Sequence, residues 1–278
     1  MFNVSRETIL HIKHFIIMNG VTVLGKIISV VNQKGGVGKT TTAVNLAAGV
    51  GLYGKKVLLV DADPQGNTTS GYGINKKDAA LSSYELLIGT AKVEQVIKKT
   101  MFKNVDIVPA SINLAAAEVD LIEQQHREAR LKMALSPIRE NYDYIFIDCP
   151  PSLGLITINA LNACDTVLVP IQCEYFALEG LSQLMASVRQ VKRLYNPTLE
   201  IEGIVLTMYD ARLNLTAQVV SEIKKYFANK LYKTAIPRAV RLSEAPSFGQ
   251  PIQYYDKRSK GADAYNSLAK EFIKKNRR

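Results

Sequence analysis

The stretch that decides the fold is Lys26-Ile27-Ile28-Ser29-Val30-Val31-Asn32-Gln33-Lys34-Gly35-Gly36-Val37-Gly38-Lys39-Thr40-Thr41, followed by a helical pattern over residues 42–53. A β-branched run, a glycine-rich loop and a helix in this order predict a phosphate-binding loop. The glycines let backbone N–H groups turn toward phosphate oxygens, and the helix N-terminus adds partial positive charge. In such a loop Lys39 reaches the β- and γ-phosphates, and the Thr40 hydroxyl ligates Mg²⁺.

Similar short apolar runs recur along the chain. They cover residues 27–31, 57–60, 105–108, 144–147, 166–169 and 201–206. Because these runs do not alternate with polar residues, each strand is expected to be covered on both faces. The segments between them are long enough for right-handed crossovers, and helices are expected over residues 115–135 and 178–194. The sequence therefore predicts an α/β fold with a doubly wound, mostly parallel sheet and helices on both faces.

Composition excludes several other classes. The chain has 278 residues, 47% hydrophobic and 22% charged, with a mean hydropathy of +0.01, which is ordinary for a globular protein. The most apolar window, residues 14–25, is too short and too interrupted for a membrane span. Three cysteines, Cys149, Cys164 and Cys173, form no C-x-x-C pair, so neither a disulfide framework nor a zinc ribbon is predicted, and a reducing cytoplasm fits best.

The expected organisation is a leader over residues 1–25 and one domain over residues 26–278. The leader resembles a signal peptide only faintly, because it lacks a small-x-small cleavage site. The sequence leaves open whether Met1 or Met18 is the initiator.

The net charge is +10, and most of the excess lies near the C-terminus. Residues 201–278 hold 15 Lys and Arg against 7 Asp and Glu. This imbalance favours a polyanionic partner such as nucleic acid or anionic lipid, although a merely soluble basic face has the same composition.

Three aspartates follow predicted strands at the sheet edge where ligands bind in open α/β folds. Asp61 and Asp63 end the second strand within Asp61-Ala62-Asp63-Pro64-Gln65-Gly66-Asn67. Asp148 closes the apolar run 144–147, an arrangement that holds Mg²⁺ through water in phosphoryl-transfer proteins. Cys149 is interpreted as a packing residue, because no histidine lies near it in the sequence.

The loop differs from the usual phosphate-binding pattern, because Gln33 stands six residues before Lys39 where glycine is expected, and Lys34 precedes the glycine pair. It resembles the deviant Walker A motif of the ParA/MinD superfamily of P-loop ATPases. Residues 148–154, 172–180 and 236–247 resemble those of the chromosomal ParA (Soj) partitioning proteins, and the resemblance spans residues 26–274.

The resemblance implies a Mg²⁺-dependent ATPase of weak intrinsic turnover that binds ATP and ADP. Its ATP-bound sandwich dimer binds double-stranded DNA without sequence preference, and a ParB-type protein stimulates hydrolysis and releases it, driving chromosome or plasmid segregation. Lys34 then reaches the partner subunit's ATP, Asp63 orients the attacking water, and Asp61 and Thr40 join Asp148 around the metal. This activity implies a cytoplasmic, nucleoid-associated protein.

The family pattern also assigns binding residues. The nucleotide contacts are Lys34, Gly35, Gly36, Val37, Gly38, Lys39, Thr40 and Thr41, with Met208 and Pro237 as an adenine slot. Phosphate contacts to DNA map onto Arg212 and Arg241, and Lys224 and Lys225 are further candidates within the helix pattern over residues 215–231. Arginine suits backbone phosphates because its charge and fork geometry need no base edge. Ordinary solvated helix charges are the alternative interpretation of these four residues.

Two other classes can be compared with this one. A MinD-like membrane-cycling ATPase, which positions cellular machinery, needs an amphipathic C-terminal helix, and the apolar stripe Tyr265, Leu268, Ala269, Phe272 and Ile273 has that spacing. A last helix docked on the core explains the same stripe and is preferred, so no membrane partner is expected. A nitrogenase-reductase-like iron–sulfur protein is excluded because the three cysteines do not fall at fitting motif positions.

Overall fold

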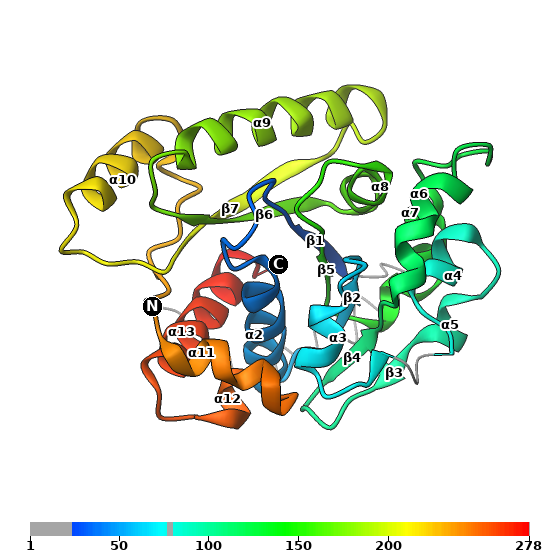
Figure 1. The fold of residues 1–278 in the computed structure, drawn as a ribbon, viewed down its shortest axis with the longest axis horizontal. Helices are drawn as coiled ribbons and strands as arrows, with labels where there is room; N and C mark the ends of the chain where they lie inside the picture. Colours follow the sequence, from blue (N-terminus) through cyan, green and yellow to red (C-terminus); the bar gives the residue numbers. More distant parts are fainter. Residues whose placement is uncertain (1–23, 77–79, 278) are drawn as a thin grey trace, which may run out of the picture.

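The computed structural model describes residues 24–76 and 80–277, which fold around one central sheet (Figure 1). Its seven strands lie in the order β3-β4-β2-β5-β1-β6-β7. They are β1 (Lys26–Val30), β2 (Val57–Asp61), β3 (Lys98–Lys99), β4 (Val105–Val108), β5 (Tyr144–Asp148), β6 (Thr166–Gln172) and β7 (Glu200–Thr207). All neighbours are parallel except β3 and β4. The predicted fold class is confirmed, and β3 is an added antiparallel edge strand.

Helices cover both faces of the sheet (Figure 1). One face carries α2 (Lys39–Leu52), α11 (Val240–Glu244), α12 (Ile252–Tyr255) and α13 (Lys260–Lys275). The other carries α4 (Ser83–Ile88), α5 (Val93–Val96), α6 (Ala117–Asp120), α7 (Arg130–Leu135), α8 (Leu155–Ala163), α9 (Ala177–Leu194) and α10 (Asn214–Phe227). The short elements α3 (Asn67–Gly71), η2 (Ile112–Ala116), η3 (Ser136–Asn141) and η4 (Ala245–Phe248) complete the connections.

The strands divide their side chains between two hydrophobic clusters. In β1, Ile28 and Val30 face α2 and α13, whereas Ile27 packs under the opposite helix layer. In β5, Tyr144 and Phe146 share the α2 side. Because helices cover both faces of the sheet, both sets of strand side chains are buried, and each strand is a continuous apolar run. Residues two apart share a face, so the aspartate that ends β5 points toward α2 as well.

The C-terminal helix is part of the core. Tyr265, Leu268, Ala269 and Phe272 of α13 are each at most 1% exposed, and α13 packs against α2. The approach is close, because a Cβ on Gly49 of α2 would come within 2.8 Å of the Ala269 methyl group. The preferred interpretation of the apolar stripe is confirmed, because these four residues are buried in the core and Ile273 packs partly buried against it. None of the helices described here has the length and apolar character that a membrane span requires.

The prediction of one long helix over residues 115–135 is wrong. The chain forms η2 and α6, then turns, with His126 in the left-handed region at φ 55°, before α7 begins. In this turn, side chains of two asparagines in α8 bond to backbone groups that a continuous helix would have paired with each other. Asn159 donates to the carbonyl of Arg127 at 2.7 Å and accepts from Leu131 N at 3.1 Å, and Asn162 donates to the carbonyl of Glu128 at 2.8 Å.

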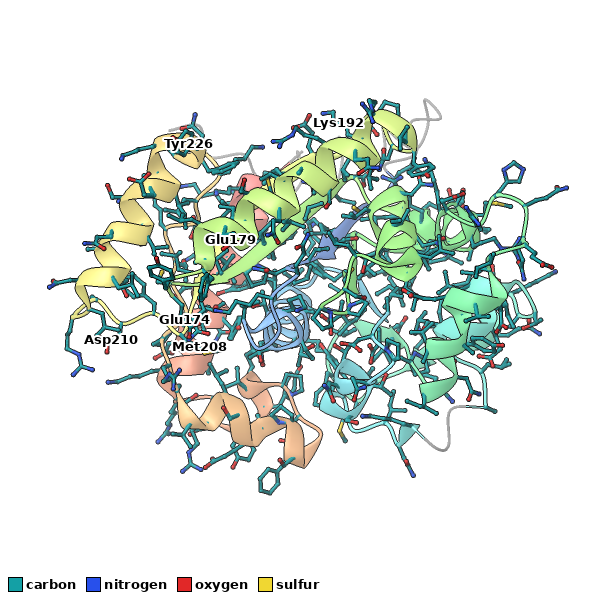
Figure 2. The ribbon with its side chains drawn as sticks, turned by 45° about the horizontal axis from the view of Figure 1, so that its top comes forward. Glu174, Glu179, Lys192, Met208, Asp210 and Tyr226 are labelled. Carbon is teal, nitrogen blue, oxygen red and sulfur yellow. The ribbon has the colours of Figure 1, made fainter. Side chains whose placement is uncertain are left out.

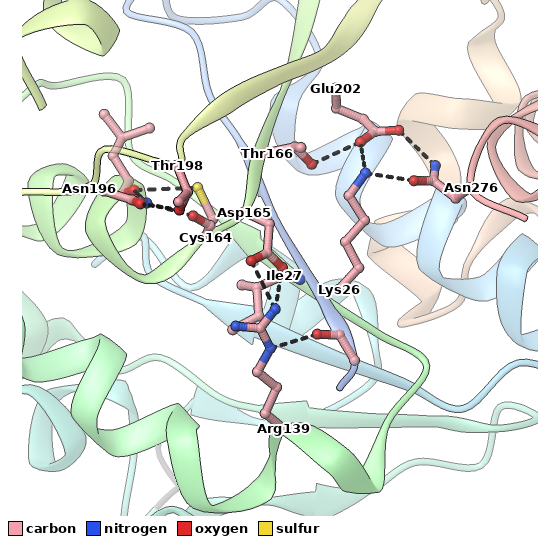
Figure 3. Close-up of polar contacts among 12 residues, drawn as sticks. Lys26, Ile27, Arg139, Cys164, Asp165, Thr166, Asn196, Thr198, Glu202 and Asn276 are labelled. Atoms are coloured by element: carbon pink, nitrogen blue, oxygen red, sulfur yellow. Dashed lines mark hydrogen bonds and ion pairs between the residues drawn. The ribbon is translucent and has the colours of Figure 1, made fainter. Parts of the chain in front are cut away.

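Two polar networks join the starts of β1, β6 and β7, at the end of the sheet opposite the glycine loop (Figure 3). Lys26 forms an ion pair with buried Glu202, and Asn276, after α13, bonds to both at 2.6 and 2.7 Å. A second network joins Arg139 to Asp165 at 2.6 Å and to the carbonyl of Gly25 at 2.7 Å. Residues 1–23 of the expected leader lie outside the described residues.

Candidate phosphate-binding site

The glycine loop is open and rigidly supported. Gly36 and Gly38 adopt φ values of 74° and 84°, which favour glycine. A Cβ on Gly35 or Gly36 would meet no atom within 4 Å, so a ligand can approach the backbone of the loop closely here. Asn32 ties the loop to β6, because its amide donates to the carbonyl of Pro170 at 2.8 Å. The hydroxyl of Thr207, at the end of β7, donates to the carbonyl of Val37 at 2.8 Å.

The two lysines of the loop occupy different places. Lys39 is 7% exposed, and its Nζ donates to the carbonyl of Lys34 across the loop at 3.0 Å. Burial lowers the pKa of Lys39, against the opposing effect of Asp148. The Lys34 side chain is 34% exposed and forms an ion pair with Glu174, after β6. Lys39 is therefore placed for a ligand inside its own loop, whereas Lys34 stands at the rim.

Asp148 is the buried acid facing the start of α2. One of its oxygens accepts hydrogen bonds from the hydroxyls of Thr40 at 2.8 Å and Thr68 at 2.7 Å. The other, Oδ1, is buried and accepts no hydrogen bond within the described part of the chain. Burial, reinforced by the nearby Asp61 carboxylate, raises the pKa of Asp148 to about 7. An orphaned carboxylate oxygen beside a threonine hydroxyl fits a divalent cation that takes its remaining ligands from phosphate and water.

Asp61 and Asp63 differ in their hydrogen bonds. Both oxygens of buried Asp61 accept hydrogen bonds: Oδ2 from the backbone and hydroxyl of Thr69 at 2.8 and 2.6 Å, and Oδ1 from Asp63 N at 3.2 Å. Burial raises the pKa of Asp61 to about 6. Asp61 thus holds the loop that carries Asp63. Asp63 lies 8% exposed at the site, with one oxygen accepting from Gln65 N at 2.9 Å.

Protein carboxylates do not form a complete metal cage here. No group of three or more His, Cys, Asp or Glu residues with a metal-binding arrangement occurs in residues 24–76 and 80–277. The three cysteines are free and buried. A cation at Asp148 would therefore depend on ligands brought by a phosphate group.

The ends of β6 and β7 complete this edge (Figure 2). Gln172 pairs with Thr207, so Glu174 and Met208 follow neighbouring strand ends. Met208 has a left-handed backbone at φ 48°, and the next residue, Tyr209, donates its N–H to the carbonyl of Ile236 at 2.9 Å. This contact sets Met208 beside the segment that contains Pro237. The two residues of the predicted adenine slot are therefore neighbours. Glu174, Asn32 and Thr207 were not singled out from the sequence, because their roles depend on partners far along the chain.

The four basic candidates separate into two places. Arg212 follows the loop at Met208, and Arg241 follows Pro237 in the adjoining segment, so these two lie at the same end of the molecule as the glycine loop. Lys224 and Lys225 lie in the last turn of α10, about 15 Å along the helix axis from its start. In Figure 2, Asp210 lies near the start of α10 and Tyr226 near its end.

Carboxylates accompany three of the four basic side chains. Arg212 is 88% exposed and bonds to Asp210 at 2.6 Å, Arg241 bonds to Glu244 at 2.8 Å, and Lys225 pairs with Glu222.

The parallel sheet, glycine loop, buried lysine and paired threonine and aspartate define a P-loop nucleotide-binding protein. A family described as an AAA domain matches residues 25–201. The sporulation initiation inhibitor protein Soj of Bacillus subtilis (strain 168) is 60% identical over 248 residues, which are 89% of this chain and 98% of Soj. The chromosome partitioning protein ParA of Myxococcus xanthus is 50% identical, over 92% of this chain and 90% of ParA.

A solved structure agrees with this fold. A cobyrinic acid a,c-diamide synthase from Mycobacterium smegmatis, with bound ADP and magnesium, has a TM-score of 0.79 at 34% identity and covers 90% of this chain and 95% of its own. The chain belongs to the ParA/Soj family of partitioning ATPases.

Proposed function

We propose that the chain binds and hydrolyses Mg²⁺-ATP in the glycine loop. Backbone N–H groups of residues 35–41 and the buried Lys39 hold the phosphates, and Met208 and Pro237 flank the adenine. Thr40 and Asp148 hold Mg²⁺, with Asp61 shaping the site. The neighbour with ADP and magnesium supports this assignment, as does the orphaned Oδ1 of Asp148. Bound Mg²⁺ neutralises phosphate charge, and it also relieves the repulsion that Asp61 and Asp63 exert on Asp148.

Asp63 is the proposed water-orienting group. Its backbone N–H bonds to Asp61 and one of its oxygens is held by Gln65 N, so the carboxylate is held in place near Lys39. In phosphoryl transfer the protein mainly supplies positioning and charge neutralisation. A lone chain supplies only Lys39 to the phosphates, because Lys34 is paired with Glu174. Weak intrinsic turnover follows from this incomplete set of cations.

The observation that carries the proposal is the placement of the two lysines. The Lys34 side chain is 34% exposed at the rim of the loop, and its proposed role is to reach the phosphates of a second copy. A cation supplied across an interface offsets the repulsion between two bound triphosphates. Pairing of two chains then depends on which nucleotide is bound. This switch is the core of the proposed function.

DNA is the proposed partner of the paired form. Arg212 and Arg241 lie on adjoining segments at one end of the molecule and suit backbone phosphates, with Lys224 and Lys225 as a second group. Pairing doubles the number of such contacts, so retention on DNA becomes conditional on ATP. A ParB-type protein is proposed to promote hydrolysis and release the chain from nucleoid DNA, which drives segregation. No membrane partner is proposed, because the apolar stripe of α13 is buried.

Co-sedimentation tests this proposal. The full chain is mixed with nonspecific duplex DNA or with anionic liposomes, without nucleotide and with Mg²⁺-ADP or Mg²⁺-ATP, while released phosphate is measured with and without a ParB-type protein. We expect retention on DNA with ATP alone, and faster phosphate release with the ParB-type protein. Equal retention in all nucleotide conditions would overturn the switch, and ATP-dependent sedimentation with liposomes would favour the membrane-cycling alternative.

A further inference from the structure

Two aromatic side chains stand exposed beside the glycine loop. Tyr175 is 79% exposed and Phe176 is 60% exposed, and their rings pack edge to face with centroids 4.9 Å apart. They lie between β6 and α9, directly after Glu174. Single exposed hydrophobic residues are ordinary on protein surfaces, but adjacent large aromatic rings are typical of interaction sites. We call Tyr175 and Phe176 the aromatic pair.

The aromatic pair is continuous with Lys34. Phe176 and Lys34 line the same small hollow, together with Val37 of the glycine loop and Gly180 of α9. Glu174, which precedes the aromatic pair, holds the Lys34 ammonium group. A second chain that meets Lys34 at this hollow would therefore find Phe176 beside it. The aromatic pair and the cation form a single surface.

The charges of this surface select the kind of partner. Glu174 directly precedes the rings and Glu179 lies in the first turn of α9 (Figure 2), and these acids disfavour a nucleic acid backbone. The surface also carries Lys34, so it holds both signs of charge around an apolar centre. A patch with both signs can pair with a copy of itself about a twofold axis, because each cation can face the other copy's anion.

We propose that the aromatic pair is the apolar anchor of the ATP-dependent pairing surface, and that its partner is a second copy of this chain. The inference rests on the proposed function, which requires Lys34 to reach the partner's nucleotide. ATP draws Lys34 away from Glu174 and toward the partner, and the rings are buried as the two surfaces meet. Aromatic residues at the centre of an interface are commonly hot spots, whose truncation to alanine strongly weakens binding.

The absence of tryptophan from the chain allows a direct test. Phe176→Trp, made in the hydrolysis-blocked Asp63→Ala background, places one indole at the proposed surface. Tyr226→Trp, at a residue 78% exposed on α10, is the matched control. We expect Mg²⁺-ATP to shift the indole emission of the Phe176→Trp variant to shorter wavelength and protect it from acrylamide, with a midpoint that depends on protein concentration. The control emission should not change.

Each other outcome is decisive. A concentration-independent shift in the Phe176→Trp variant would mean closure within one chain and would overturn the proposal. Unchanged emission in a sample that light scattering shows to be dimeric would overturn the proposal and leave the nucleotide switch intact. A sample that stays monomeric in the Asp63→Ala background with ATP would refute the proposed function itself.

An alanine pair gives the energetic test. Tyr175→Ala/Phe176→Ala should raise the dimer Kd at least about 30-fold in sedimentation equilibrium. The affinity of the monomer for a fluorescent ATP analogue should stay unchanged. Tyr226→Ala/Phe248→Ala removes two rings of similar exposure from α10 and η4 and should leave the dimer Kd at the parent value. Equal Kd values for the two double variants would overturn the anchor role.

Discussion

The proposed DNA contacts predict a measurable change in salt dependence. Arg212 is 88% exposed, and its guanidinium bonds to both oxygens of Asp210, at 2.9 Å from Nε and 2.6 Å from Nη2. A DNA phosphate must compete with this carboxylate. Arg212→Ala should therefore weaken binding, whereas Asp210→Asn should strengthen it, because the arginine is released and a negative charge is removed near the phosphates.

The magnitude follows from the number of phosphates contacted. Each phosphate contact contributes about −0.9 to the slope of log K against log salt concentration. In a twofold dimer each substitution acts twice, so Arg212→Ala should make the slope shallower by about 1.8. Adding Arg241→Ala should bring the change to about 3.6. Asp210→Asn keeps the contact, so it should raise affinity a few-fold with little change in slope, since an exposed pair binds weakly.

Fluorescence anisotropy with a labelled nonspecific duplex measures these slopes. The titrations use the Asp63→Ala background with Mg²⁺-ATP over a series of KCl concentrations, and light scattering checks that every variant still pairs. Lys224→Ala/Lys225→Ala, at the far end of α10, shows whether the second group contributes. An unchanged slope in the Arg212→Ala/Arg241→Ala variant that still dimerises would refute the assignment of this face to DNA.

Three further predictions concern catalysis, the core and pH. Asp63→Ala should bind ATP and DNA but persist as a dimer, and multiple-turnover phosphate release at the parent rate would remove Asp63 from the mechanism. Phe272→Ala should lower the free energy of unfolding in urea by about 3–5 kcal/mol, because the ring is fully buried, whereas exposed Lys274→Ala should change it by less than about 0.5 kcal/mol. Equal values for the two variants would contradict the core role of α13. Burial raises the pKa of Asp61 to about 6 and of Asp148 to about 7, above roughly 4 in the unfolded chain. The metal-free folded state then binds more protons, so its free energy of unfolding should fall as pH rises from about 4 to 7, and Asp148→Asn should flatten this fall. Identical pH profiles for parent and variant would contradict this effect.

Local patterns were sufficient to predict much of the fold. Each predicted strand is present, because apolar runs such as residues 144–147 need the two helix layers that bury them. The predicted helix over residues 115–135 does not form, because Asn159 and Asn162 bond to backbone carbonyls there. The positions of these asparagines depend on tertiary packing. The antiparallel strand β3, only two residues long, has no periodicity to detect.

The site was predictable in its residues but not in its contacts. The motif indicated Lys39, Thr40 and Asp148, and the fold brings them together because β1 and β5 are neighbours. The ion pair between Lys34 and Glu174 joins residues 140 positions apart, so no local pattern could have indicated it. The pairing of Arg212 with Asp210 is local, and the charge pattern alone could have shown it. The roles of these residues remain predictions.

The most direct test of the account is the mass of the Asp63→Ala chain in solution, with and without the added substitution Lys34→Ala. Light scattering would be measured without nucleotide, with Mg²⁺-ADP and with Mg²⁺-ATP, at one protein concentration. We expect Asp63→Ala to be a dimer only with Mg²⁺-ATP, and the Lys34→Ala double variant to be a monomer in all three conditions. ATP-dependent dimers of equal affinity with and without Lys34 would contradict the claim that this lysine joins the two chains.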